Sequence, residues 1–233
     1  MNPDPSRALD EKLRALAELA AGAGHELNNP VATISGHVQQ LLPGERDPDR
    51  IQALQTIGAQ ALRIRDMIGD LMLFARPPQP RPIRLDLQGV AEVVVSKLAS
   101  EAHQKDCRLS LRSSGPLPVL GDPAHTRTLF SELTRNSIEA AAGGGQVVLE
   151  GGQILHEGRP AARWVWTDTG RGLQAHELEH LFDPFFSGRQ AGRGLGFGLA
   201  KAWRIATLHQ AILRVTSPVG CSAVLTLIWP LDT

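Results

Sequence analysis

The sequence predicts a multidomain chain in which an all-α helical hairpin is followed by an α+β sandwich. Three observations lead to this fold class. Apolar residues recur every three or four positions in the first third of the chain, as in amphipathic helices. A stretch rich in proline, residues 75–82, then ends that pattern. Beyond it, short alternating segments typical of strands are mixed with helical segments in no strict order.

The bulk composition narrows the class of protein. The chain has 233 residues, of which 42% are apolar, so it can bury a core. Lys plus Arg equals Asp plus Glu at 24 each, and this zero net charge argues against nucleic-acid binding. The N-terminus lacks the pattern of a signal peptide and no apolar run could span a bilayer, so we expect a cytoplasmic chain without a membrane segment. Cys107 and Cys221 fit no zinc spacing and are expected to be buried apolar groups.

Two apolar stripes predict the helices of the hairpin. The first stripe runs through residues 13–41 and the second through residues 51–75. Between them, residues 42–48 place Gly44 between two prolines, which stops a helix. Two helices alone offer too little partner surface for such stripes. We therefore expect two copies of the chain to form a four-helix bundle, which makes the protein a homodimer.

The elements of the second half follow in order. Alternation from Ile83 predicts a strand, a helical run follows at 90–102, and alternation resumes at Cys107. Asp122 and Pro123 predict a helix start, because a capping carboxylate precedes a proline in the first turn. We expect that helix to run to the glycines at 143–145, followed by strands at 146–155 and 161–167, a loop, a helix at 195–208, and strands at 211–217 and 223–229.

Two segments offer polar groups beside predicted helix and strand ends. Glu132 and Asn136 lie one helical turn apart, where a carboxylate and an amide oxygen could hold magnesium or orient a water. A solvated helix face would explain the same pattern. Asp168 ends an apolar strand, and Gly170 and Gly172 would let backbone approach a ligand while its carboxylate accepts a hydrogen bond from an amine. A plain turn is the alternative.

A third segment, residues 192–200, has glycine at every second position from 192 to 198, just before a predicted helix. Backbone N–H groups at such a helix start can cradle phosphate. A Rossmann motif fits poorly, because that loop follows the first strand of its domain. Arg189 and Arg193 lie close by in the sequence and could reach phosphate oxygens.

The order of these segments is more specific than any one of them. The chain gives His-Glu-x-x-Asn-Pro, then the Asn136 helix, Asp-x-Gly-x-Gly, an aromatic loop and a glycine-rich helix start. This order resembles the catalytic core of bacterial sensor histidine kinases, over nearly the whole chain from about residue 8 to Pro230. The resemblance implies a dimerisation and histidine-phosphotransfer domain at 1–78, a proline-rich linker at 79–82, and a GHKL-type ATP-binding domain at 83–233.

The resemblance implies roles for residues of the first domain. His25 would be the phosphoacceptor, Glu26 the neighbouring acid or base, and Asn29 the residue that orients water when the domain dephosphorylates its partner. A neutral imidazole near pH 7 is a capable nucleophile. Pro30 costs about 3 kcal/mol inside a helix. We expect it to bend the helix beside an exposed His25, which gives the bundle two packings between which to switch.

The resemblance also implies a nucleotide site in the second domain. Asn136 would be the magnesium ligand and Asp168 the reader of adenine. Gly170 and Gly172 would shape the adenine pocket. The triphosphate would lie under a lid that carries Arg189, bordered by Gly194, Gly196 and Gly198.

The implied function is an ATP- and Mg²⁺-dependent protein-histidine kinase of a two-component system, which passes phosphate from His25 to an aspartate of a response regulator. A separate or missing sensor domain would supply the input. A nucleotide-binding scaffold that transfers nothing is one alternative. A gyrase- or chaperone-type ATPase is another, indicated only by Glu132, which stands where histidine kinases usually have an amide. We expect Glu132 to assist metal binding and transfer rather than to activate water.

Overall fold

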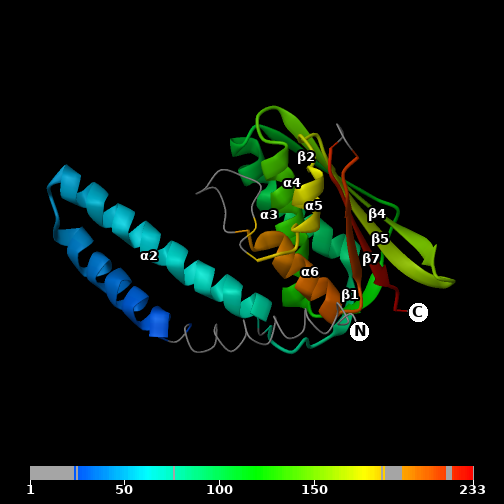
Figure 1. Ribbon diagram of the computed structural model, residues 1–233, viewed down its shortest axis with the longest axis horizontal. Helices are drawn as coiled ribbons and strands as arrows, with labels where there is room; N and C mark the ends of the chain where they lie inside the picture. The colour runs from blue at the N-terminus through cyan, green and yellow to red at the C-terminus, as the bar shows by residue number, and fades with distance from the viewer. Residues whose placement is uncertain are drawn as a thin grey trace. The chain divides into compact units, whose positions relative to one another are not determined.

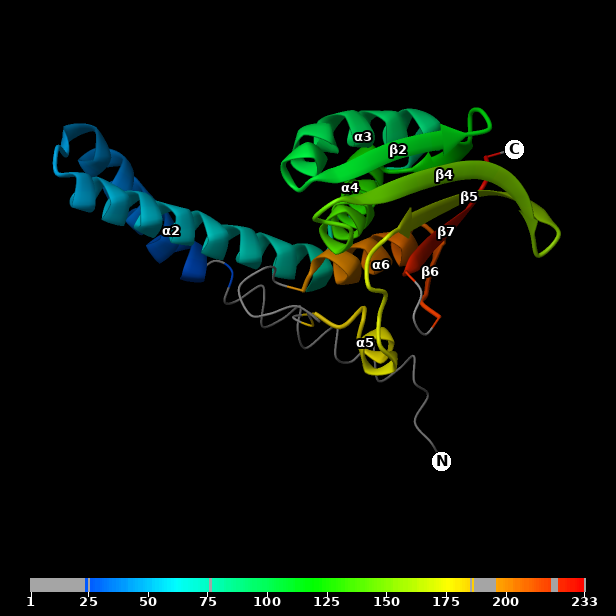
Figure 2. The ribbon, with the colours of Figure 1, turned by 90° about the horizontal axis from the view of Figure 1, so that it is seen from above.

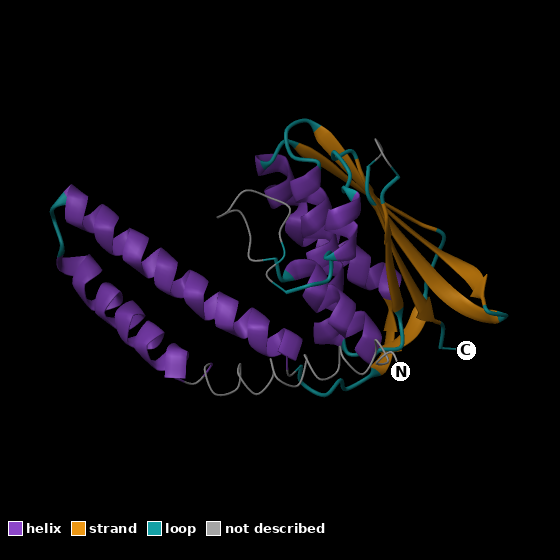
Figure 3. Cartoon of the chain, viewed as in Figure 1, coloured by secondary structure: helices purple, strands orange, loops and turns teal. Residues whose placement is uncertain are grey.

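The structure is a computed structural model that describes residues 24, 26–75, 77–184, 186, 196–218 and 222–232. The chain separates into two units, Met1–Pro78 and Gln79–Thr233. The described part of the first unit is helical, whereas the second combines helices with strands (Figure 3). No helix among the described residues is long and apolar enough to cross a membrane.

The first unit is a helical hairpin. Its first helix includes residues 26–41 and leads into a 3₁₀ turn, η1 (Leu42–Gly44), and then into α2 (Pro48–Ala75). The two helices lie side by side and run in opposite directions (Figures 1 and 2). The predicted helix stop at residues 42–48 is confirmed, and so is the end of the second helix at Ala75. The helix continues through Pro30, and the expected bend there stays a prediction.

Close contacts between small and apolar residues define the register of the hairpin. A Cβ atom built on Gly24 would lie 3.2 Å from Met72 Sδ, and one built on Gly58 would lie 3.1 Å from Val38 Cγ1. Gly24 therefore faces the last turns of α2, and Gly58 in α2 faces Val38 of the first helix. The buried apolar side chains of the described part of the hairpin come mainly from the two predicted stripes: Val31, Val38, Ala61, Ile68 and Phe74.

Part of each stripe stays exposed in the single chain. Leu27, Ile34 and Leu41 follow one another at seven-residue intervals, with 48%, 43% and 58% of their surface exposed. Ile57 and Ile64 show the same spacing on α2 and are 48% and 42% exposed. Apolar residues at heptad spacing are typical of a helix that packs against another helix. We call these five residues the exposed stripe.

The second unit contains a five-stranded sheet in the order β2-β4-β5-β7-β6. Only the β2–β4 pair is parallel among these described strands. A short antiparallel pair, β1-β3, forms a second sheet. The strands are β1 (Ile83–Asp86), β2 (Cys107–Ser113), β3 (Pro118–Gly121), β4 (Gly145–His156), β5 (Arg159–Asp168), β6 (Ile212–Thr216) and β7 (Val224–Pro230).

Three helices cover one face of this sheet: α3 (Leu87–Gln104), α4 (Pro123–Ala140) and α6 (Gly198–Leu208), as Figures 1 and 2 show. A short helix, α5 (Ala175–Glu179), follows β5. The α4 helix begins as predicted, because Asp122 Oδ1 accepts hydrogen bonds from the N–H groups of Ala124 and His125 at 2.9 and 3.1 Å. It ends at Ala140, short of the glycines at which we expected it to stop.

The core holds α4 against β5. The ring of Phe130 packs edge to face on Trp164 and Trp166, with centroids 5.4 and 5.2 Å apart. Trp166 Nε1 donates a hydrogen bond to Thr134 Oγ1 at 3.0 Å, which satisfies the one polar atom of a fully buried ring. Cys107 is buried as a free thiol, as expected, and Cys221 lies outside the described residues.

Candidate functional site

The polar groups on α4 lie beneath the first turn of α6. A Cβ atom on Gly198 would stand 2.9 Å from Glu132 Oε2 and 3.0 Å from Asn136 Nδ2. Because glycine lacks that atom, the start of α6 can approach the α4 side chains closely. Only 17% of the Glu132 side chain is exposed. The interpretation of this segment as a solvated helix face is therefore wrong.

An ion pair closes this end of the site. Lys201 Nζ donates to Glu132 Oε1 at 2.7 Å, and 8% of the Lys201 side chain is exposed. Arg135 Nη1 lies 4.0 Å from the same oxygen. Sequence reasoning missed Lys201. The available signal was a lysine one turn after Gly198, within a helix whose other early residues are apolar or small.

The opposite end of the site is built where β5 ends. Asp168 is 3% exposed, and its Oδ1 accepts a hydrogen bond from the Gly170 N–H at 2.9 Å. Burial raises the pKa of the Asp168 carboxyl, and the hydrogen bond from Gly170 opposes that shift. Gly172 has a φ of +73°, a left-handed backbone that glycine adopts without strain.

Gly170 brings this end into contact with α4. A Cβ atom built on it would meet the carbonyl oxygen of Ala140 at 2.8 Å. Ala140 lies one helical turn beyond Asn136, which itself lies one turn beyond Glu132. One face of α4 thus runs for about 12 Å between the two ends, at a rise of ~1.5 Å per residue. The glycine-rich start of α6 lies at one end of this face, and the buried carboxylate of Asp168 lies at the other.

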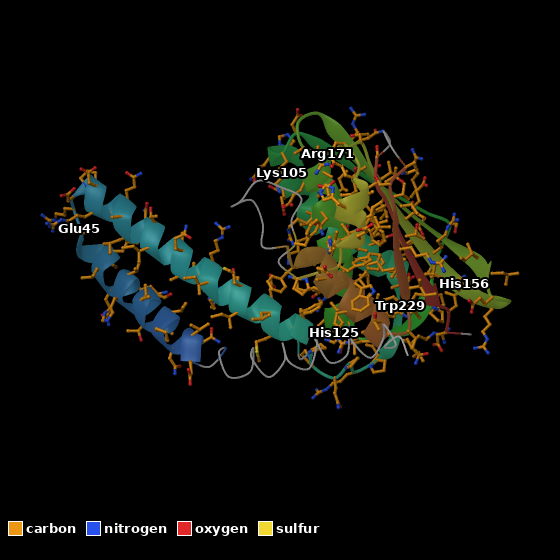
Figure 4. The ribbon with its side chains drawn as sticks, viewed as in Figure 1. Glu45, Lys105, His125, His156, Arg171 and Trp229 are labelled. Atoms are coloured by element: carbon orange, nitrogen blue, oxygen red, sulfur yellow. The ribbon has the colours of Figure 1, made fainter. Side chains whose placement is uncertain are left out.

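The loop after Gly170 is fixed by a buried carboxylate that sequence reasoning also missed. Arg171, labelled in Figure 4, donates from Nη1 to Glu177 Oε2 at 3.0 Å, and its Nη2 bonds Oε1. The Glu177 side chain is 4% exposed and also accepts from the Gln174 N–H at 2.8 Å, in a capping box at the start of α5. The Arg171 guanidinium holds the pKa of Glu177 below its usual value.

The structure brings together some of the predicted site residues. Asn136, Glu132 and Gly198 meet at one end of the α4 face, and Asp168 and Gly170 at the other. Gly196 precedes α6 with a φ of +69°. In the first unit, Glu26 and Asn29 are exposed on the first helix. His25, Arg189 and Gly194 lie outside the described residues.

Chemically, the face on α4 suits an elongated ligand with unlike ends. Backbone N–H groups at a helix start favour an anion, and an amide oxygen beside them can hold a cation bound to that anion. A buried carboxylate such as Asp168 accepts hydrogen bonds from an amine. A nucleoside triphosphate with an amino group on its base has both an anionic end that binds a cation and an end that donates hydrogen bonds.

Comparison with known domain families decides the assignment. Residues 121–233 match the family described as histidine kinase-, DNA gyrase B- and HSP90-like ATPase, and residues 15–80 match the His Kinase A (phospho-acceptor) domain. The chain contains a histidine kinase catalytic core. Its two matched domains are those of a sensor histidine kinase catalytic core, as the order of motifs predicted.

Relatives of known type support the family. The chain is 27% identical over 226 residues to the sensor histidine kinase ZraS of Escherichia coli strain K12, which covers 95% of this chain and 47% of ZraS. It is 31% identical over 202 residues to the sensor protein kinase PilS of Pseudomonas aeruginosa, covering 84% of this chain and 37% of PilS. The chain thus spans less than half the length of these two histidine kinases.

Solved structures share the fold. Full-length ShkA in complex with AMPPNP superposes with a TM-score of 0.79 at 21% identity, over 93% of this chain and 46% of that protein. The histidine kinase ThkA, solved in complex with the response regulator TrrA, gives 0.68 at 17% identity over 97% of this chain and 65% of that chain. The predicted fold, a helical unit followed by an α/β ATPase unit, is confirmed.

Proposed function

We propose that this histidine kinase chain binds ATP along the α4 face, transfers the γ-phosphoryl group to His25, and passes it to an aspartate of a response regulator. The observation that carries the proposal is the close approach of Gly198 to Glu132 and Asn136, at the opposite end of the face from buried Asp168. This face lies within residues 121–233, which match the ATPase family. The residues that match the phospho-acceptor domain, 15–80, include His25.

The nucleotide would lie with its base at Asp168 and its phosphates at α6. Asp168 would accept a hydrogen bond from the amino group of adenine, because Gly170 orients one carboxylate oxygen and leaves the other available. Gly170 and Gly172 would shape the wall of this pocket. Phosphate oxygens would accept hydrogen bonds from backbone N–H groups near Gly196 and Gly198. Two residues outside the described part of the chain, Gly194 and Arg189, would complete the phosphate site.

The residues present fit a magnesium ion held mainly by the substrate. The amide group of Asn136 lies beside the proposed phosphate position with its Nδ2 nearest Gly198, and its oxygen would be the ligand, while Glu132 is already paired with Lys201. Mg²⁺ usually keeps several waters and takes one or two protein oxygens together with phosphates. It would supply positive charge to the phosphate oxygens, and Asn136 would hold it in place.

The transfer itself would use the first unit. The neutral ring of His25 would attack the γ-phosphorus, so that an N–P bond forms and the bond to the departing ADP oxygen breaks. Glu26, next in sequence and exposed, would accept the ring proton. Asn29, exposed one turn further on, would orient water in the reverse task of dephosphorylating the regulator. The ThkA complex with its regulator supports a response regulator as the partner.

We also propose the domain limits 1–78, 79–82 and 83–233. The linker residue Arg81 donates its backbone N–H to Asp122 Oδ2 at 2.9 Å, so the linker is attached to the start of α4. The exposed stripe on the hairpin supports a homodimer, since a second hairpin would cover those apolar residues and complete a four-helix bundle.

The function is tested by incubation with γ-labelled ATP and Mg²⁺, followed by assay for acid-labile, base-stable phosphate on the protein. His25→Gln should abolish labelling while nucleotide binding persists, because the acceptor and the nucleotide site lie in different units. His37→Gln is the matched control, since His37 is an exposed histidine of the same unit and should leave labelling unchanged. Full labelling of the His25 variant would contradict the assignment of His25 as the phosphoacceptor. Nucleotide binding without labelling of the parent would favour a scaffold.

A further inference from the structure

We propose that Lys201 is a positioning residue that holds the Glu132 carboxylate in an ion pair and so keeps it from activating water against ATP. This inference rests on the proposed kinase function, because it concerns the γ-phosphate end of the same site. It assigns Lys201 a role in the choice of acceptor: phosphate goes to His25 rather than to water.

The first observation is the strength of the pair. The distance of 2.7 Å between Lys201 Nζ and Glu132 Oε1 is that of a charge-assisted hydrogen bond. Both side chains are largely shielded, at 8% and 17% exposure, so water screens the attraction only weakly. Such a pair fixes the position of the Glu132 carboxylate and places a positive charge directly on one of its two oxygens.

A second cation acts on the same oxygen. Arg135 Nη1 lies 4.0 Å from Glu132 Oε1, and Arg135 Nε donates to Glu101 Oε2 at 3.3 Å. Glu101 also accepts from Lys105 Nζ at 3.0 Å, and Lys105 is labelled in Figure 4. Arg135 is therefore held beside Glu132 by an acid on α3. One oxygen of Glu132 faces cations from both α4 and α6.

The remaining oxygen points to where phosphate would lie. Glu132 Oε2 is 2.9 Å from the position of a Cβ atom on Gly198, at the first turn of α6. Glu132 thus lies close enough to serve as a general base for an attacking water, a role typically worth about 10²–10⁴-fold in rate. The position of Glu132 alone would therefore permit hydrolysis of ATP. In this proposal the ion pair with Lys201 is what suppresses it.

The suppressed reaction can be written step by step. The oxygen of a water forms a bond to the γ-phosphorus, and the bond from that phosphorus to the bridging oxygen breaks, leaving its electron pair on ADP. The proton of the water passes to a Glu132 oxygen. With the Lys201 ammonium on that carboxylate, protonation would leave a shielded ammonium without its counter-ion, which is strongly unfavourable. Transfer to His25 places no proton on Glu132 and avoids this cost.

The test measures phosphate release, His25 labelling and nucleotide affinity side by side. Lys201→Met keeps the length of the side chain and removes its charge, and it should raise phosphate release by about tenfold or more. Lys201→Arg should restore release to near the parent level. Adding Glu132→Gln to Lys201→Met should abolish the rise, because the base is then missing. Arg112→Met is the control, since it breaks an exposed pair with Glu150 on the sheet and should change none of the three quantities.

Two results would overturn the proposal: unchanged or lower release in Lys201→Met at equal nucleotide affinity, or a rise that persists when Glu132→Gln is added. Should Lys201→Met fail to fold, Lys201→Gln removes the same charge with a polar side chain. Unchanged or lower phosphate release in that variant, at equal nucleotide affinity, would refute the proposal. Failure of the kinase function has a different signature, namely ATP binding without labelled His25 in the parent, whatever the variants release.

Discussion

Gly170 lies so close to the last turn of α4 that a Cβ atom on it would stand 2.8 Å from the carbonyl oxygen of Ala140. The same residue donates its N–H to Asp168 Oδ1 at 2.9 Å. One glycine thus joins the end of β5 to the end of α4 and orients the buried carboxylate along the helix face. Any side chain there would have to move backbone, which is far less yielding than the end of a side chain.

Gly170→Ala is therefore expected to lower both stability and nucleotide affinity. Overpacking of this kind costs about 1–3 kcal/mol, and the displaced loop carries Asp168 away from its position. Thermal melting and fluorescent-nucleotide titration would measure the two effects. Gly89→Ala in α3 is the control, because a Cβ atom there meets nothing within 4 Å and alanine favours a helix by about 1 kcal/mol over glycine. Equal nucleotide affinity in Gly170→Ala and the parent would contradict this account of the site.

Asp168→Asn should separate stability from binding. Burial raises the pKa of Asp168 in the folded state above the ordinary value of 3.8, so the folded state holds its proton to higher pH than the unfolded state does. The contribution of Asp168 to stability is therefore complete below pH 3.8 and declines as pH rises through the folded pKa. Asparagine carries no such charge and should be as stable as the parent or more stable at pH 7.

The asparagine variant should nevertheless bind adenine nucleotides poorly, because an amide oriented by Gly170 is a weaker acceptor than a carboxylate. Denaturant unfolding between pH 4 and pH 8, compared with the parent, measures the first effect, and nucleotide titration measures the second. A variant that is less stable than the parent at pH 7 yet still binds ATP normally would reverse both expectations.

Local signals predicted much of this fold, and distant contacts explain what was missed. Asp122 and Pro123 identify the start of α4 because a cap and a first-turn proline act within a few residues. The four-residue strand β3 has no alternation long enough to recognise and exists through its pairing with β1. The helix α5 has only five residues, and its buried Glu177 depends on Arg171.

The candidate site divides in the same way. Glu132, Asn136 and Asp168 could be singled out because each stands in a short motif. The partner of Glu132 could not, since Lys201 is 69 positions away and reaches it only after α6 packs on α4. The local sequence of α6 shows a lysine among apolar and small residues, but it does not identify the acid with which that lysine pairs.

Arg171→Met tests the ion pair that fixes the loop after β5. The Arg171 hydrogen bonds lower the pKa of Glu177 below the ordinary 4.5, so the pair stabilises the fold above that pH and the stabilisation is lost as pH falls through the folded pKa. At pH 7 the variant leaves Glu177, 4% exposed, without its cation. We expect a loss of about 1–3 kcal/mol in the free energy of unfolding.

The loss in Arg171→Met should shrink as the pH is lowered, because protonated Glu177 no longer needs the cation. Urea unfolding at pH 7 and pH 4 would show this. Arg112→Met, which breaks the exposed pair with Glu150, should cost less than about 1 kcal/mol at either pH. Equal losses for the two arginine variants at pH 7 would show that Glu177 does not depend on Arg171.

Ile34→Lys tests whether a second copy covers the exposed stripe. Ile34 is the middle member of the series Leu27, Ile34 and Leu41, and 43% of it is exposed in the single chain. A two-fold symmetric bundle would bury this residue twice, so each substitution removes two apolar contacts and adds two buried charges. Burying one such side chain contributes about 1.5–3 kcal/mol to the free energy of association. The variant should therefore be a monomer at micromolar concentration, where we expect the parent to be a dimer.

Light scattering after size-exclusion chromatography would measure the mass of each form. Leu155→Lys is the control, since Leu155 is 76% exposed at the end of the β4–β5 hairpin in the other unit and carries the same chemical change. It should remain a dimer. Ile34→Lys should still bind ATP with parental affinity, because every residue of the proposed nucleotide site belongs to the second unit. A dimeric Ile34 variant, or a monomeric Leu155 variant, would place the contact between copies elsewhere than on the hairpin, and the exposed stripe would then need a different partner.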